Sequence, residues 1–258
     1  MAERARPVFL APHYDDVALS CGGTVALHAE QGQCPVILTC FGGEPEGPLS
    51  PFATHQHRWR GLTDNEALMT RRAEEQAAAA VLGAEPLWLD LPDAVYRDAR
   101  YLSDEQLFGS LHPDDADLLP RLRAALTEIL DSAGVSPAWF AVPLGIGNHV
   151  DHQLVRDLGH ALRRRGWTVW AYEDFPYSAL VRRPRELVSL AHVHTTGDCW
   201  IQPLAVSQLE KRITAIKCYR SQLTVLFRDL GDPAEAVRRA ATEAGGGRPA
   251  ERLWRLRG

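Results

Sequence analysis

Two short segments of the sequence gather the residue types that bind a divalent cation. The first is residues 11–16 (APHYDD), which end in two adjacent carboxylates. Neighbouring carboxylates repel each other unless a cation neutralises them. His13 and Asp16 are separated by one turn, so both side chains can converge on one ion, while Asp15 then faces whatever occupies an open coordination position. The competing interpretation is that Asp15 and Asp16 only cap the helix that follows.

The second segment, residues 145–152 (GIGNHVDH), adds two histidines and an aspartate. One of these imidazoles would complete a set of His, Asp and His around one ion, with a position left open for water. That donor set is typical of catalytic zinc, because structural zinc sites are closed by four protein ligands. Taken together, the two segments indicate a catalytic metal centre, which neither would establish alone.

Both segments follow apolar runs that predict β-strands, and these strands alternate with helical stretches. Such alternation is typical of βαβ units around a parallel sheet. We therefore predict an α/β fold, a Rossmann-like three-layer sandwich with a mainly parallel sheet, in one domain over residues 1–258. Ligands of such sheets bind outside the carboxyl ends of the strands, where both segments lie. The expected strands are 7–12, 36–41, 87–91, 139–144 and 168–172, and the expected helices are 17–31, 63–82, 118–132 and 151–165.

Two stretches interrupt this alternation. Residues 42–62 contain Gly-Gly and three prolines without periodicity, so they form either a lid-like loop over the site or a plain surface excursion. The tail, residues 230–258, contains Gly-Gly-Gly before a short apolar segment. It predicts either a hinge that leads to a docked segment or a frayed terminus.

The composition limits the possible partners. The net charge of −5 argues against nucleic acid, whose phosphates are bound by clustered Lys and Arg. No apolar run is long enough for a membrane span, and the N-terminal run is too short for a signal-peptide core, which predicts a cytoplasmic protein. The five cysteines are odd in number and show no CxxC spacing, which is typical of reduced thiols.

The two metal-binding segments resemble the motifs of the PIG-L (LmbE-like) family of zinc de-N-acetylases. Residues 13–16 are similar to its HPDDE motif, and residues 149–152 (HVDH) are similar to its HxDH motif. The resemblance covers residues 7–223. It extends to Arg71-x-x-Glu74 before Leu82-Gly83, to Leu91-Pro92-Asp93, and to Lys217-x-Tyr219-x-Ser221-Gln222.

The resemblance implies a metal-dependent amidohydrolase with one zinc ion per chain. Its small-molecule substrate would be an amino sugar, such as N-acetylglucosamine, or a glycoconjugate that carries an N-acetyl or other N-acyl group. A homo-oligomer is in keeping with the family. Carried over by position, the zinc ligands are His13, Asp16 and His152, and the general base is Asp15. The remaining roles are oxyanion stabilisation or amine protonation for His149, orientation or tuning of His149 for Asp151, and substrate hydroxyl contacts for Arg71 with Asp93 or Asp98.

The chain departs from the family motif at two positions. Tyr14 replaces the usual Pro, which we expect to place a phenol near the cleft, and Val17 replaces the usual Glu. Residues 112–115 (HPDD) reproduce the motif more literally, but no strand precedes them and no Gly-Gly follows, so we interpret them as a helix start. Four other histidines are interpreted as structural: His55, His57, His192 and His194.

The alternative is a Rossmann-like nucleotide- or sugar-binding protein without hydrolase activity. Its glycine turn would be residues 145–147 (GIG) or residues 20–23 (SCGG). Neither turn completes GxGxxG, and no acidic residue ends the second predicted strand. The zinc content of the protein separates the two interpretations, since only the hydrolase needs the ion.

Overall fold

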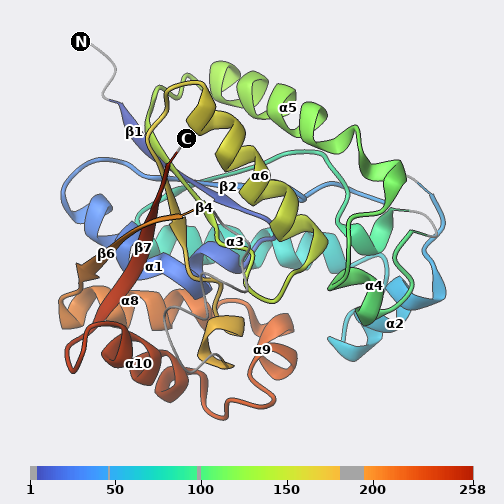
Figure 1. Cartoon of the computed structure of the whole chain (residues 1–258). Coiled ribbons are helices and arrows are strands. Elements are labelled where there is room, and N and C mark those ends of the chain that lie inside the picture. The colour runs from blue at the N-terminus through green and yellow to red at the C-terminus, as the bar shows by residue number, and fades with distance from the viewer. Residues whose placement is uncertain (1–4, 46, 98–99, 181–194, 258) are drawn as a thin grey trace.

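A mostly parallel β-sheet forms the centre of the molecule (Figure 1). The computed structural model describes residues 5–45, 47–97, 100–180 and 195–257, and within these ranges the sheet has seven strands in the order β3-β2-β1-β4-β5-β7-β6. The first five in this order are parallel, while β7 is antiparallel to both β5 and β6. The strands are β1 (Arg6–Ala11), β2 (Val36–Thr39), β3 (Glu85–Trp88), β4 (Pro137–Pro143), β5 (Val169–Tyr172), β6 (Thr195–Pro203) and β7 (Ala250–Leu256).

Strand β1 shows why the central strands consist of continuous apolar runs. Val8 and Leu10 face one side of the sheet and belong to one buried cluster, whereas Phe9 and Ala11 face the other side and belong to a second. Parallel strands buried on both faces need apolar side chains at successive positions. This burial explains why the strands could be predicted from apolar runs without alternation.

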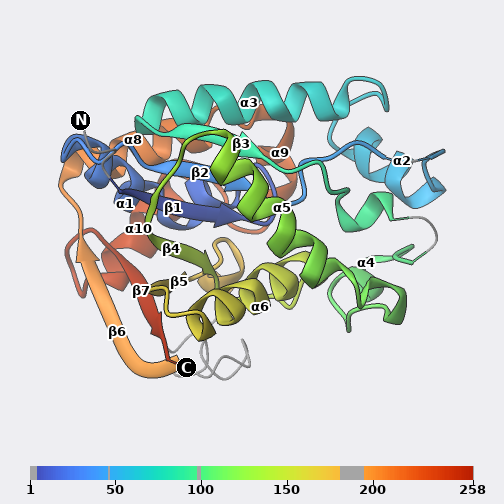
Figure 2. The same ribbon diagram turned by 90° about the horizontal axis from the view of Figure 1, so that it is seen from above.

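Helices cover both faces of the sheet, as Figure 2 shows. Helices α1 (Asp16–Glu30), α3 (Ala67–Leu82) and α8 (Val206–Ile216) pack on the face of Phe9 and Ala11. Helices α5 (Leu118–Ser132) and α6 (Val150–Arg164) cover the opposite face. The predicted three-layer α/β fold is therefore confirmed. The remaining elements are α2 (Pro51–Trp59), α4 (Asp104–Leu107), α9 (Arg220–Leu226), α10 (Pro233–Ala244) and the 3₁₀ turns Ala94–Tyr96, Pro113–Asp115 and Tyr177–Leu180.

The two interrupting stretches contain more regular structure than we expected. Residues 42–62 include α2, whose first turn is capped because Ser50 Oγ accepts a hydrogen bond from the N–H of Ala53 at 3.0 Å. The tail contains α10 and β7, and β7 lies inside the sheet between β5 and β6. The docked segment is thus correct and the frayed terminus is wrong. Among the helices of the described ranges, none has the length and apolar composition needed to cross a bilayer.

Helix α1, which begins at the site, has a kink that the far end of the chain stabilises. Cys21 leaves the helical conformation (φ −141°, ψ 27°), and the N–H groups of Gly23 and Thr24 donate instead to the Glu251 carboxylate at 2.9 and 2.7 Å. Arg212 forms an ion pair with Glu251 at 3.0 Å and also donates to the carbonyl of Leu19. The ion pair therefore takes the place of the helical bond between Leu19 and Gly23.

Candidate metal centre and active site

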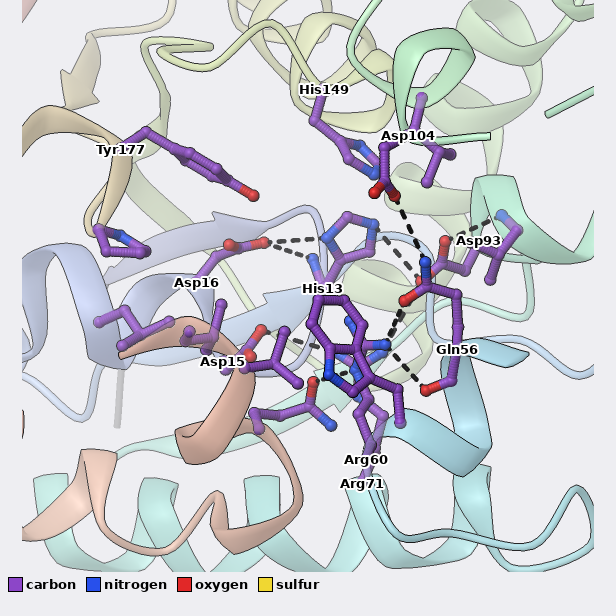
Figure 3. A pocket seen from close by; sticks show the side chains of 18 of the residues that line it. His13, Asp15, Asp16, Gln56, Arg60, Arg71, Asp93, Asp104, His149 and Tyr177 are labelled. Carbon is purple, nitrogen blue, oxygen red and sulfur yellow. Dashed lines mark hydrogen bonds and ion pairs between the residues drawn. The ribbon is translucent and has the colours of Figure 1, made fainter. Parts of the chain in front are cut away.

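The two predicted metal-binding segments meet at the carboxyl ends of neighbouring strands. The first segment follows β1 and the second follows β4, which are paired in the sheet. The chain crosses to opposite sides of the sheet after these strands, so their ends form a topological switch point, where α/β sheets bind ligands. A cavity of about 330 Å³ opens there, and His13, Asp15, Asp16 and His149 line it (Figure 3). His152 lines it as well.

His13, Asp16 and His152 form a compact donor set. Asp16 Oδ2 lies 3.4 Å from His13 Nδ1 and 3.4 Å from His152 Nε2. Metal–ligand bonds of about 2.0–2.2 Å at tetrahedral angles hold ligand atoms roughly 3.4 Å apart, so this spacing suits zinc. Two imidazoles and one carboxylate also leave a fourth position open. The donor set therefore fits a catalytic metal ion.

A second set of possible donors shares His13 and adds His149 and Asp151. The carboxylate of Asp151 is already engaged on both oxygens. Oδ1 forms an ion pair with Arg97 at 2.7 Å, and Oδ2 accepts from the N–H of Ala94 at 3.0 Å. A guanidinium this close opposes a cation at Asp151, so the set with Asp16 is the better metal site.

Each imidazole of the preferred set contacts a buried carboxylate through the ring nitrogen that does not face Asp16. Asp151 Oδ2 lies 3.0 Å from His13 Nε2, and Asp174 Oδ1 lies 2.6 Å from His152 Nδ1. Such outer carboxylates fix the ring orientation of metal-binding histidines. The sequence analysis assigned no role to Asp174. Asp174 follows β5, the neighbour of β4, but this strand order is known only from the folded sheet.

The role expected for Asp151 needs a correction. We expected Asp151 to orient or tune His149. Its carboxylate contacts His13 rather than His149, although its charge does raise the pKa of His149 against the effect of burial. Only the backbone N–H of Asp151 reaches His149, donating to Nδ1 at 3.2 Å. Since Nδ1 accepts this bond, a neutral His149 carries its proton on Nε2. Burial, and then the neighbouring His13, lower the pKa of His149 to about 3, which favours the neutral imidazole.

Asp15 is a buried carboxylate next to the donor set, and its side chain caps no helix. It occupies the N-cap position of α1, yet its side chain forms no capping hydrogen bond. The helix-cap interpretation is therefore wrong for Asp15. Its nearest charged partner is Arg71, whose Nη2 lies 3.5 Å from Oδ1. Burial raises the pKa of the Asp15 carboxyl, while Arg71 counteracts this shift.

The acidic surroundings of the donor set attract positive charge. Burial alone would lower the pKa of His13, but Asp93, Asp151 and Asp16 raise it well above its ordinary value. Asp16 behaves in the opposite way, because burial would raise its pKa and the imidazoles of His152 and His13 lower it. These mutual shifts are those expected of acidic and basic groups arranged to share a cation.

Comparison with known families identifies the family to which this chain belongs. A model described as GlcNAc-PI de-N-acetylase, PIG-L, matches residues 8–162, which contain both metal-binding segments. The chain belongs to the PIG-L family. The predicted resemblance is thereby confirmed.

Two curated relatives of this PIG-L protein are both called 2'-N-acetylparomamine deacetylase. The protein of Niallia circulans is 32% identical over 66% of this chain, a stretch equal to 66% of the relative's own length. The protein of Streptomyces fradiae is 31% identical over 75% of this chain and 68% of its own length. The predicted N-deacetylase function is therefore confirmed at the level of the family.

Two solved PIG-L-type structures resemble the whole chain. The zinc-inhibited form of teicoplanin deacetylase has a TM-score of 0.82 at 25% identity and covers 97% of each chain. The deacetylase of the A40926 pseudoaglycone has a TM-score of 0.81 at 27% identity and covers 98% of this chain and 97% of that chain. The similarity thus extends past residue 162 to the C-terminal strands.

The PIG-L residues expected to contact substrate also reach the cavity. Arg71 Nη1 lies 3.7 Å from Asp93 Oδ2, and Asp93 in turn lies 3.6 Å from His13 Nε2. Asp98, the alternative to Asp93, lies outside the described residues. Several lining residues had no predicted role, and most come from α2 and the segments around it: Gln56, His57, Arg60, Tyr96, Asp104, Phe108, Tyr177 and Gln222.

The two departures from the PIG-L motif are accommodated in the core. Tyr14 is buried, and its hydroxyl donates to the carbonyl of Gly42 at 2.7 Å. The ring does not itself line the cavity but packs between Trp88 and Arg71, of which Arg71 does line it. A side chain at position 42 would meet the Tyr14 hydroxyl at 2.6 Å, so this contact requires glycine. Val17 packs between the sheet and the helices of the same layer.

The remaining predicted histidines have structural surroundings. His112 caps the 3₁₀ turn Pro113–Asp115 by accepting from the N–H of Asp114 at 3.2 Å, which confirms the helix start. His57 is buried between Asp64 and Tyr96, with 2.7 Å to each partner. His192 and His194 lie outside the described residues.

Proposed function

We propose that this PIG-L protein is a zinc-dependent hydrolase that removes an N-acetyl or other N-acyl group from an amino sugar or glycoconjugate. The observation that carries the proposal is that a zinc-like donor set shares its cavity with a buried carboxylate that caps no helix and pairs only loosely with Arg71. His13, Asp16 and His152 would hold the ion, and Asp15 lies in the same cavity without a capping bond. A nucleotide-binding protein would need neither feature.

The ion contributes one kind of chemistry when bound: it polarises the amide oxygen and makes a water molecule more acidic. Asp15 then acts as the general base and takes the proton from the attacking water on its carboxylate. As the carbon–nitrogen bond breaks, the same carboxyl group returns this proton to the leaving nitrogen. The products are a carboxylic acid, acetic acid for an N-acetyl substrate, and an amine; transfer of the acid's proton to the amine leaves a carboxylate and an ammonium group.

His149 stabilises the negative charge that develops on the amide oxygen. Its Nδ1 accepts from the Asp151 N–H, which leaves the Nε2–H as a donor on a ring that lines the cavity. A donor positioned in advance at an oxyanion stabilises the transition state without reorganisation. Protonation of the amine by His149 is the less favourable alternative, because its neutral ring would have to release the Nε2 proton.

The test compares the two neighbouring carboxylates. Asp15→Asn preserves the size of the side chain but removes the base, so it should keep the zinc of the wild type and lose turnover by roughly 10²–10⁴-fold. Asp16→Ala removes a ligand, so it should lose zinc, and added zinc should restore part of its activity. The assays are metal analysis and release of acetate from 2'-N-acetylparomamine and other N-acetylated amino sugars.

His112→Ala is the matched control, because the literal HPDD sequence lies away from the site, and it should keep both zinc and turnover. Normal turnover in Asp15→Asn would remove Asp15 as the base. A wild-type protein that binds no zinc and releases no acetate would favour the sugar-binding alternative.

A further inference from the structure

The HPDD segment at residues 112–115 places one carboxylate deep inside the protein. Asp115 is fully buried, although Asp114 beside it is exposed and His112 is half-buried. The Tyr101 hydroxyl donates to Asp115 Oδ2 at 2.8 Å, and Arg100 pairs with Oδ1. A buried carboxylate is costly unless charged partners compensate it. Asp115 therefore needs a reason beyond the start of a helix.

Arg97 connects Asp115 with the candidate active site. Its Nε lies 3.2 Å from Asp115 Oδ2, and its Nη2 lies 2.7 Å from Asp151 Oδ1. These contacts are ion pairs without well-aligned hydrogen bonds, so the charges rather than the angles hold the group. The guanidinium also lies against the rings of Phe41 and Tyr101. Arg97 is thus clamped between two buried carboxylates.

Asp151, which Arg97 holds in place, in turn fixes the orientation of the His13 ring. With Oδ1 held by Arg97, Oδ2 is directed to the Ala94 N–H and to His13 Nε2, each at 3.0 Å. The His13 ring is then oriented with Nδ1 towards Asp16. We propose that Arg97, anchored by Asp115, is a positioning residue that selects which of the two overlapping donor sets binds the metal.

The selection works because both sets share His13. Without the guanidinium, Oδ1 of Asp151 would lose its ion pair, and the carboxylate next to His13 and His149 would itself attract a cation. With Arg97 in place, Asp151 serves as the support of His13, and the ion is left to Asp16 and His152. The inference rests on the proposed zinc site, but it concerns residues that do not touch the ion.

The experiment measures zinc affinity by competition with a chromogenic chelator, together with the absorption spectrum of the Co²⁺-substituted protein. Asp115→Asn and Arg97→Met should weaken zinc binding by about 10-fold or more, as removal of outer supports does. Both should alter the Co²⁺ spectrum, and Arg97→Lys should restore part of the affinity by returning the charge. The variant that combines Asp115→Asn with Arg97→Met should bind zinc no more weakly than Arg97→Met alone, since Asp115 acts through Arg97.

Tyr101→Phe and Asp114→Asn are the matched controls. Tyr101→Phe removes a buried hydrogen bond to Asp115 while Arg97 keeps its partner, so it should lower stability but keep wild-type zinc affinity and spectrum. Asp114→Asn should change neither the stability of the protein nor its zinc affinity and Co²⁺ spectrum. Zinc affinity that follows stability across all variants, or that is unchanged in folded Asp115→Asn, would show that the network is only structural and overturn the proposal. Should Arg97→Met fail to fold, Asp115→Asn and Arg97→Lys decide the question. A wild-type protein without zinc would instead contradict the proposed function.

Discussion

Glu75 is a buried carboxyl group on α3 that is only half satisfied. The Tyr219 hydroxyl donates to its Oε2 at 2.6 Å, while its Oε1 is buried without a hydrogen-bond partner. Burial raises the pKa of Glu75 from 4.5 to about 8, with Asp15 adding to the shift and Tyr219 opposing it. At neutral pH the folded protein therefore keeps a proton on Glu75 that the unfolded chain has released.

This difference predicts how stability depends on pH. A carboxyl pKa that is higher in the folded state favours folding at low pH, and the benefit is lost as the pH rises from about 4.5 to 8. Glu75→Gln mimics the protonated group and should flatten this decline, leaving the variant more stable than the wild type at pH 8 by on the order of a few kcal/mol. Urea unfolding at pH 5 and pH 8 measures the effect. Glu74→Gln, one position earlier, is the control, and parallel curves for Glu75→Gln and the wild type would contradict the prediction.

At the residue level, the sequence predicted the side chains of the candidate donor set but not Asp174 and Arg97, which contact this set or the groups around it. His13, Asp16 and His152 could be predicted because a metal site needs particular residue types, and these lie at the ends of strands. Asp174 and Arg97 could not be predicted in this way. Their roles depend on contacts with His152 and Asp151, which are distant from them in the sequence. Nothing in the local sequence distinguishes such a carboxylate from an ordinary turn residue.

At the level of elements, the kink in α1 depends on Glu251 in β7. This carboxylate satisfies the N–H groups freed at the kink and pairs with Arg212, and both charged side chains are almost fully buried. Removal of one partner of a buried pair leaves an uncompensated charge. The kink is therefore stabilised by a contact between segments at opposite ends of the sequence.

Glu251→Gln should accordingly lower the free energy of unfolding by about 3 kcal/mol, because Arg212 would lose its only nearby acid among the described residues. Denaturant unfolding at pH 7 measures the loss. Glu210→Gln breaks an exposed ion pair with Arg238 and should cost about 0–1 kcal/mol. Equal losses in the two variants would mean that the kink does not need its ion pair.

The elements themselves were predictable where one periodicity dominates. The expected helix 118–132 agrees with α5, because its leucines recur along a single face packed on the sheet. Helix α2 was missed although Ser50 and Pro51 are a recognisable helix start, since the prolines around it favoured a loop. Strand β7 could not be placed from its sequence, because its pairing with β5 and β6 is decided by distant segments.

For the whole molecule, the metal is expected to contribute to stability. An ion that binds only the folded protein stabilises it by about 2.7 kcal/mol when its free concentration is 100-fold above Kd. Removal of zinc by a chelator should therefore lower the melting temperature of the wild type, and added zinc should reverse the change. His152→Ala should melt at the same temperature with and without chelator, whereas His112→Ala should respond like the wild type. An unchanged wild-type melting curve would argue against an ion at this site.

The place of β7 in the sheet has a consequence for the synthesis of the protein. A ribosome makes Ala250–Leu256 after the other six strands of the described sheet, yet this strand fills the gap between β5 and β6. Until it emerges, the nascent chain exposes two unpaired strand edges, which readily pair with other chains. Premature termination before Ala250 should therefore yield a client of chaperones and proteases rather than a shortened enzyme.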